Sequence, residues 1–99
     1  MFVQIIVSQL RPSATRDEFV ELHRQTAEWM KCHPECVSYE VYEGADGAIA
    51  DRIVWSSRKG ALRGNQDHAE TDIATGMQRI VESYSSFFGE QICLDRPST

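Results

Sequence analysis

The sequence predicts an α+β fold in which a four-stranded antiparallel sheet is covered on one face by two helices. The 99 residues alternate between strand-like and helix-like apolar spacing in the order βαββαβ. A helical pattern stops before His33-Pro34, and a strand with strict alternation follows at once. A Gly-Ala-Asp-Gly turn at 44–47 joins that strand to another, as in a hairpin. Two crossovers around one hairpin are most simply accommodated with both helices on the same side.

The first strand and the first helix are strongly marked. Phe2 to Leu10 is rich in β-branched residues and apolar on both faces, which favours a central strand that is covered on both sides. Thr15 and Glu18 then have the spacing of a capping box, so a helix should begin at residue 16 and end before Pro34. Its inward stripe consists of Phe19, Leu22, His23, Thr26, Ala27 and Met30.

The hairpin supplies the second and third strands, which we expect from about Cys36 to Tyr42 and from about Ala48 to Ser56. Alternation places Val37, Tyr39 and Val41 on one face of the second strand. On the third strand, one face is shared by Ile49, Asp51, Ile53 and Trp55.

The second half of the chain is predicted to be one long helix and a last strand. Residues 58–65 are interpreted as a basic connection, and the helix should begin near Gln66 or Asp67 and close at Gly89. Gln91 to Asp95 would be the last strand. One domain then spans 1–95, with a tail at 96–99. The apolar stripe of this helix would be Ala69, Ile73, Met77, Ile80, Val81, Tyr84 and Phe88.

This layout is the ferredoxin-like arrangement, and it leaves one sheet face bare. Because the first strand is apolar on that face too, we expect a homodimer joined sheet to sheet. The net charge of −5, with basic residues scattered, argues against a nucleic-acid partner. Apolar runs are too short for a membrane span. The first residues resemble a strand rather than a signal peptide, so a cytoplasmic location with reduced cysteines is expected.

Two segments resemble the antibiotic-biosynthesis-monooxygenase-like group of the dimeric α+β-barrel superfamily. His33–Tyr42 is similar to that group's helix-to-strand join, which commonly reads His-Pro-Gly-Cys-x-Ser-Tyr-Glu. Asp51–Ser57, with Ala61 beyond it, is similar to its third strand with a terminal Trp. Glu35 replaces the usual Gly, and position 64 is Gly where members often carry His. The first strand lacks the Asn of the haem-degrading branch, which disfavours haem degradation.

The resemblance implies a reaction class. Enzymes of the group oxidise aromatic, polyketide-like phenols or anthrones with dioxygen and with no cofactor, metal or flavin, in a cavity between sheet and helices. We therefore expect a cofactor-independent monooxygenase acting on a small aromatic ligand. One alternative is a non-catalytic ligand-binding or accessory dimer of the same fold. Another is an isomerase or cyclase that uses the same base without oxygen.

Three residues are candidate bases. His68 is the first, because an ordinary histidine pKa suits proton removal at neutral pH, and a place in the first turn of the second helix would lower that pKa. It could equally be a solvated residue. His23 lies on the inward stripe, as a second base or a structural histidine. Asp51 shares a face with apolar residues, where a buried carboxylate could act as a base. It could instead lie at an exposed end of the strand or pair with Arg52 or Arg58.

Two aromatic residues are candidate substrate contacts. Trp55 and Tyr39 would line the cavity, and each is also explained as a core aromatic. Cys32, His33 and Cys36 invite a metal interpretation, but their spacing is loose and no second Cys/His pair follows. No metal site is therefore expected.

Overall fold

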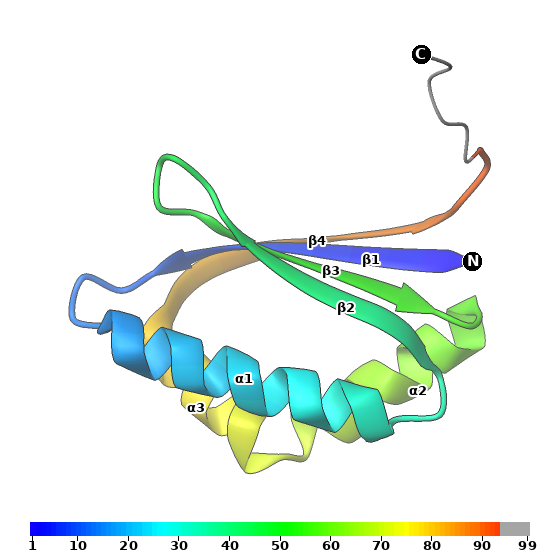
Figure 1. The fold of residues 1–99 in the computed structure, drawn as a ribbon, viewed down its shortest axis with the longest axis horizontal. Helices are drawn as coiled ribbons and strands as arrows, with labels where there is room; N and C mark the ends of the chain where they lie inside the picture. The colour runs from blue at the N-terminus through cyan, green and yellow to red at the C-terminus, as the bar shows by residue number, and fades with distance from the viewer. Residues whose placement is uncertain (94–99) are drawn as a thin grey trace.

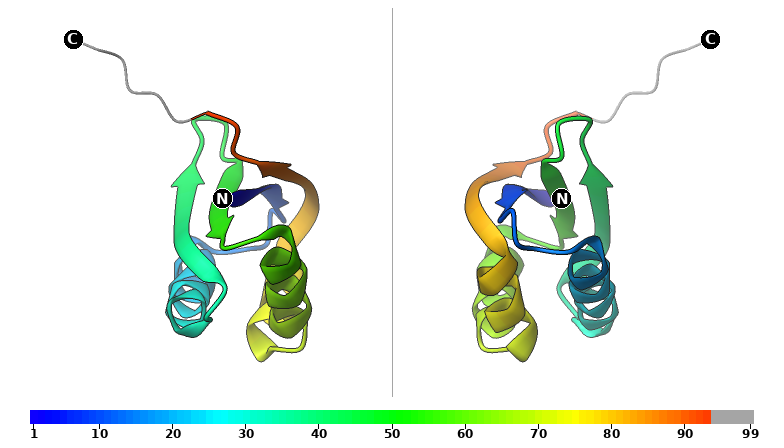
Figure 2. Two further views of the ribbon diagram at one scale, coloured as in Figure 1. Left: turned by 90° about the vertical axis from the view of Figure 1, so that its right-hand side faces the viewer. Right: turned by 90° about the vertical axis from the view of Figure 1, so that its left-hand side faces the viewer.

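The computed structural model describes residues 1–93. Its elements are β1 (Phe2–Leu10), α1 (Arg16–Cys32), β2 (Cys36–Glu43), β3 (Ile49–Trp55), α2 (Arg58–Ala69), α3 (Asp72–Ile80) and β4 (Val81–Glu90). The strands form one antiparallel sheet in the order β2-β3-β1-β4, and the helices lie on one face of it (Figure 1). Seen from the end, α1 lies below β2, while α2 and α3 lie below the β4 side (Figure 2). The predicted ferredoxin-like α+β class is confirmed.

The start of α1 follows from its capping residues. The Thr15 hydroxyl accepts a hydrogen bond from the Glu18 N–H, and the Glu18 carboxylate accepts one from the Thr15 N–H, which confirms the capping box. Phe19, Thr26 and Met30 are buried beneath the sheet. No helix within residues 1–93 is both long and apolar enough to cross a membrane.

The predicted inward face of β3 is correct, and that of β2 is correct only in part. Ile49, Asp51, Ile53 and Trp55 are all buried on the helix side. On β2, Cys36 pairs with Trp55 and Ser38 pairs with Val54, so the register shifts between them. This irregularity turns Val37 outward, where it is 52% exposed, and Cys36 packs against the core in its place.

The predicted long helix from 66 or 67 to 88 is wrong. Ser57 caps α2, which begins at Arg58 within the supposed connection. Thr71 then accepts a hydrogen bond from the Ala74 N–H and starts a new helix, α3. Residues 81–90 form an edge strand against β1.

Helical spacing of the apolar residues misled the prediction for β4. Tyr84 and Phe88 are four residues apart, yet with Ser86 they also alternate along a strand. Pairing with β1 satisfies the backbone of residues 81–90, and aromatic residues such as Tyr84 and Phe88 are compatible with a strand. Residues 91–93 lie outside any strand, and the rest of the predicted strand Gln91–Asp95, like the tail at 96–99, lies outside the described residues.

Trp55 brings α2 close to the sheet. Its side chain is 0% exposed, and its ring lies directly against Gly64. A Cβ at position 64 would overlap the Cζ3 and Cη2 atoms of that ring. Ala61, one turn earlier, is also fully buried. A histidine at position 64 is thus incompatible with this orientation of Trp55.

The contact between Gly64 and Trp55 predicts a large effect of a small substitution. Gly64→Ala should destabilise the protein by about 1–3 kcal/mol, since overpacking forces either the ring or the helix to move. Gly76→Ala in α3 is the matched control, because its Cβ would meet the Leu22 side chain, nearest at Cδ2 (2.7 Å), and this flexible end can rotate away. Urea unfolding measures both. Equal stability of Gly64→Ala and wild type would contradict this packing.

Candidate functional site

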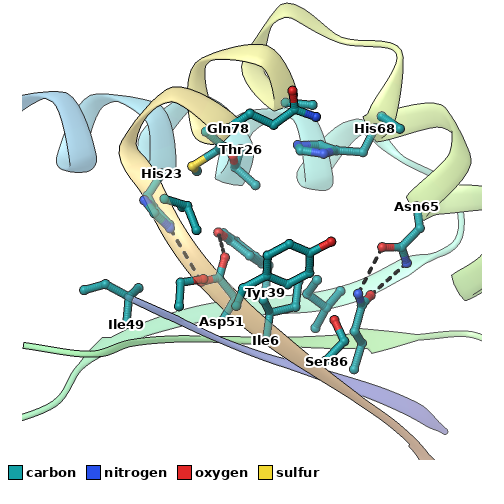
Figure 3. Close-up of a pocket in the computed structure, with 18 of the residues that line it drawn as sticks. Ile6, His23, Thr26, Tyr39, Ile49, Asp51, Asn65, His68, Gln78 and Ser86 are labelled. Carbon is teal, nitrogen blue, oxygen red and sulfur yellow. Dashed lines mark hydrogen bonds and ion pairs between the residues drawn. The ribbon is translucent and has the colours of Figure 1, made fainter. Parts of the chain in front are cut away.

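A cavity of about 640 Å³ lies between the sheet and the helices (Figure 3). Every strand and helix of the described chain contributes to its wall. Its volume is in the range of small-molecule sites. Of the five residues singled out from the sequence, the cavity wall includes His23, Tyr39, Asp51 and His68.

Asp51 is the buried acidic group on the cavity wall. It is only 9% exposed, on the inward face of β3. The Tyr39 hydroxyl donates a hydrogen bond to its Oδ2 at 2.7 Å, and His23 Nε2 lies 3.5 Å from its Oδ1. Arg52, a neighbour in sequence, pairs instead with Glu40. The carboxylate is therefore held by two cavity residues rather than by an arginine.

The tautomer of His23 follows from its other contact. Nδ1 lies 2.9 Å from the Phe19 carbonyl oxygen, which can only accept, so Nδ1 carries a hydrogen. In the neutral ring Nε2 is then bare, and it faces a carboxylate oxygen of Asp51. His23 Nε2 and the Asp51 carboxylate thus face each other on the cavity wall.

Tyr39 serves this pair as a donor. Burial, followed by the negative charge of Asp51 and the hydrogen bond to it, raises the pKa of the Tyr39 phenol above its ordinary value. The phenol therefore keeps its proton at neutral pH. It orients the Asp51 carboxylate and is not itself an acid or base.

His68 lies in the last turn of α2, not in the first turn of a helix as predicted. The negative end of a helix favours a protonated ring, so the helix-dipole argument has the wrong sign. Burial nevertheless lowers the pKa of the imidazole below 6.5, while the charge of Asp51 acts in the opposite direction. Nε2 is buried, and no group within residues 1–93 forms a hydrogen bond with it. The cavity thus contains a neutral imidazole with a free nitrogen.

Trp55 does not line the cavity. Its indole N–H donates to Gln4 Oε1 at 3.0 Å, and the ring is completely buried, so it is a core aromatic. Sequence reasoning missed Gln4 and Asn65, which do line the cavity. A polar amide within the apolar run Phe2–Val7 was the available signal for Gln4.

Packing and hydrogen bonds account for Cys36 and His33, which lie at the join between α1 and β2. Cys32 is exposed, and Cys36 packs against the core with a pKa raised by burial. His33 Nδ1 accepts the Glu35 N–H, so Nε2 donates to Asp67 at 2.9 Å. Within residues 1–93 no group of three or more His, Cys, Asp or Glu side chains is arranged to hold a metal ion.

No protein-family model and no curated protein matches the sequence. Solved structures do match it. SnoaB, a cofactor-independent oxygenase from Streptomyces nogalater, is similar with a TM-score of 0.82 and 13% identity over 94% of each chain. An antibiotic biosynthesis monooxygenase has a TM-score of 0.73 and 16% identity over 94% of this chain and 100% of that chain. Rv0793 from Mycobacterium tuberculosis has a TM-score of 0.74 and 19% identity over 98% of each chain. The chain therefore has the fold of antibiotic biosynthesis monooxygenase-like proteins.

The hydrogen bond between Tyr39 and Asp51 can be tested by removing one oxygen. Tyr39→Phe should cost about 1–3 kcal/mol of stability, because a buried carboxylate loses a donor. Tyr42→Phe is the matched control, since the Tyr42 hydroxyl donates to Glu40 at an exposed site and its loss should cost little. Thermal and urea unfolding compare the two. Equal losses would contradict the role assigned to Tyr39.

Proposed function

We propose that the protein is a cofactor-independent oxygenase that oxidises a small aromatic phenol or anthrone with dioxygen. The observation that carries this proposal is His68, whose imidazole lines a cavity of about 640 Å³ and has its pKa lowered by burial, and whose buried Nε2 has no hydrogen-bond partner within residues 1–93. Such a nitrogen is suited to take a proton from a bound ligand.

Deprotonation is the step that these residues would assist. His68 Nε2 accepts the proton of the ligand, and the negative charge of Asp51 favours the resulting imidazolium.

The ligand anion supplies the electrons for oxygen. In an anthrone, the CH₂ between the two rings becomes C=O, which is a four-electron oxidation. Dioxygen accepts those four electrons; one oxygen atom enters the product and the other leaves as water. The two hydrogens of the CH₂ leave as protons and form that water, and His68 carries the first of them.

The decisive experiment is oxygen uptake by metal-stripped protein with a panel of anthrones and hydroquinones. Uptake should exceed the rate without protein and fall at least 100-fold in His68→Gln, since general-base catalysis contributes roughly 10²–10⁴-fold. A base works only when unprotonated, so kcat/KM should rise with pH and reach half its maximum below pH 6.5, because burial lowers the pKa of His68.

Asp51→Asn distinguishes the two candidate bases. It keeps an oxygen that can accept from Tyr39 but removes the carboxylate that pairs with His23. Uptake that survives in His68→Gln and disappears in Asp51→Asn would assign the base to the His23–Asp51 pair. No uptake with any compound of the panel would replace the oxygenase with a ligand-binding dimer.

We further propose that two copies associate through the open sheet face. On that face β1 presents Val3, Ile5 and Val7, and the neighbouring β4 presents Phe87, which is 61% exposed. The helices of the described chain all lie on the opposite face (Figure 2). Apolar side chains on an uncovered sheet are stabilised by a second sheet against them.

A single charge should test this association. Val7→Asp places a carboxylate among apolar groups of the partner and should convert the dimer to a monomer in light scattering. Leu62→Asp is the control, because Leu62 is exposed on α2, away from the sheet face. A wild-type protein that is monomeric at micromolar concentration would contradict the proposal.

A further inference from the structure

Gln4 on β1 and Asn65 on α2 meet through both of their amide groups. Gln4 Nε2 donates to Asn65 Oδ1 at 3.0 Å, and Asn65 Nδ2 donates to Gln4 Oε1 at 2.8 Å. The two bonds run in opposite directions and close a ring that sets the amides edge to edge. Gln4 is 1% exposed, so this ring is a built feature of the interior.

The neighbours on one side decide which way each amide points. The Trp55 indole N–H can only donate, and it donates to Gln4 Oε1. The Ala61 carbonyl can only accept, and it accepts from Asn65 Nδ2 at 2.8 Å. Rotating either amide by half a turn would place one N–H donor against another, or one acceptor oxygen against another. Trp55 and Ala61 are both completely buried, so this is the core side of the pair.

The amides of Gln4 and Asn65 do not use all of their hydrogen-bond donors and acceptors within the pair. A primary amide has two N–H donors and two oxygen lone pairs. Gln4 Oε1 accepts twice and Asn65 Nδ2 donates twice, so both are fully used. Within residues 1–93, one N–H of Gln4 and one lone pair of Asn65 Oδ1 are left without a partner.

The two remaining positions lie side by side. Gln4 Oε1 and Asn65 Nδ2 use their outer positions on the core side, so the free N–H and the free lone pair belong to the opposite edge. Both residues line the cavity. In Figure 3 the oxygen of Asn65 is turned toward the part of the cavity that holds Tyr39 and Asp51. The cavity wall thus presents a donor and an acceptor on one edge.

We propose that this edge binds a flat ring that carries a hydrogen-bond acceptor and a donor next to each other, as in a lactam. The ligand carbonyl accepts from Gln4 Nε2, and the ligand N–H donates to Asn65 Oδ1. A ring with two adjacent acceptors sets an oxygen against Asn65 Oδ1. That mismatch leaves a buried lone pair unpaired, which corresponds to roughly tenfold weaker binding or more.

The edge also sets the direction of the bound ring. Gln4 pairs with Ile53, and Ile6 pairs with Asp51, so Gln4 and Asp51 are diagonal neighbours on the same face. Such positions are roughly 7–8 Å apart, which is about the width of a fused two-ring compound. A ring held at the amide edge therefore reaches toward Asp51. Its orientation for oxidation rests on the proposed function, whereas binding does not.

Two ligands of the same shape test the proposal. 2-Quinolone has a ring N–H beside its carbonyl, and coumarin has a ring oxygen in that place. Titration into ¹⁵N-labelled protein should shift the side-chain NH₂ signals of Gln4 and Asn65 with 2-quinolone. Coumarin should bind roughly tenfold more weakly, as expected for one lost hydrogen bond.

A pair of variants locates the preference. Asn65→Leu removes the free lone pair and should abolish the discrimination between the two ligands. Gln78→Leu removes another amide on the cavity wall that is not part of the pair, and it should keep the discrimination. If Asn65→Leu does not fold, the wild-type titrations alone decide.

Equal affinity for the two ligands would overturn the proposal. So would binding of 2-quinolone that leaves the Gln4 and Asn65 side-chain signals unmoved, or no binding of it at millimolar concentration. These measurements involve no turnover. A protein that consumes no oxygen but discriminates between the two ligands refutes the oxygenase and supports the amide edge. A protein that consumes oxygen but binds both ligands with equal affinity supports the oxygenase and refutes the amide edge.

Discussion

The hydrogen bond from the Trp55 indole to Gln4 is the contact on which the rest of the structure depends. A buried N–H without an acceptor costs about 1–3 kcal/mol, so the largest core side chain requires a polar group beside it. Gln4 supplies the oxygen and thereby brings its own amide into the interior, where Asn65 satisfies it. Asn65 can reach only because Gly64 lets α2 lie against the Trp55 ring. The packing of the core around Trp55 thus determines which polar groups lie on the cavity wall.

The cavity wall combines polar groups that can ionise with polar groups that cannot. His23 and Asp51 face each other and are kept in place by the Phe19 carbonyl and by Tyr39. His68 is neutral because burial disfavours its charged form. The amides of Gln4 and Asn65 never ionise and can only orient a ligand. An imidazole, a buried carboxylate and a pair of amides therefore line the same cavity, and the proposed proton removal from an oriented ring rests on this arrangement.

Prediction from the sequence succeeded where local pattern and tertiary environment agree. The capping box of Thr15 and Glu18, the break at Pro34 and the alternation of β3 each depend on neighbours in sequence, and each is present. Alternation placed Asp51 on the same face as Ile49, Ile53 and Trp55 but left its burial open, and the structure shows that the carboxylate is buried. His68 was selected for a helix position that it does not have, and its lowered pKa has another cause, burial. Asn65 was missed because its role depends on a partner 61 positions away.

The sequence by itself determined the fold class, the sheet face that carries Asp51 and the chemical types of the groups on the wall. Those features follow from periodicity and residue identity, which are local. Only the tertiary structure decided that residues 81–90 pair with β1 as a strand, since their apolar spacing fits a helix equally well. It also decided that Trp55 belongs to the core, and that Gln4 and Asn65 share an edge. Long-range pairing and close packing select among states that short-range propensity leaves nearly equal in free energy.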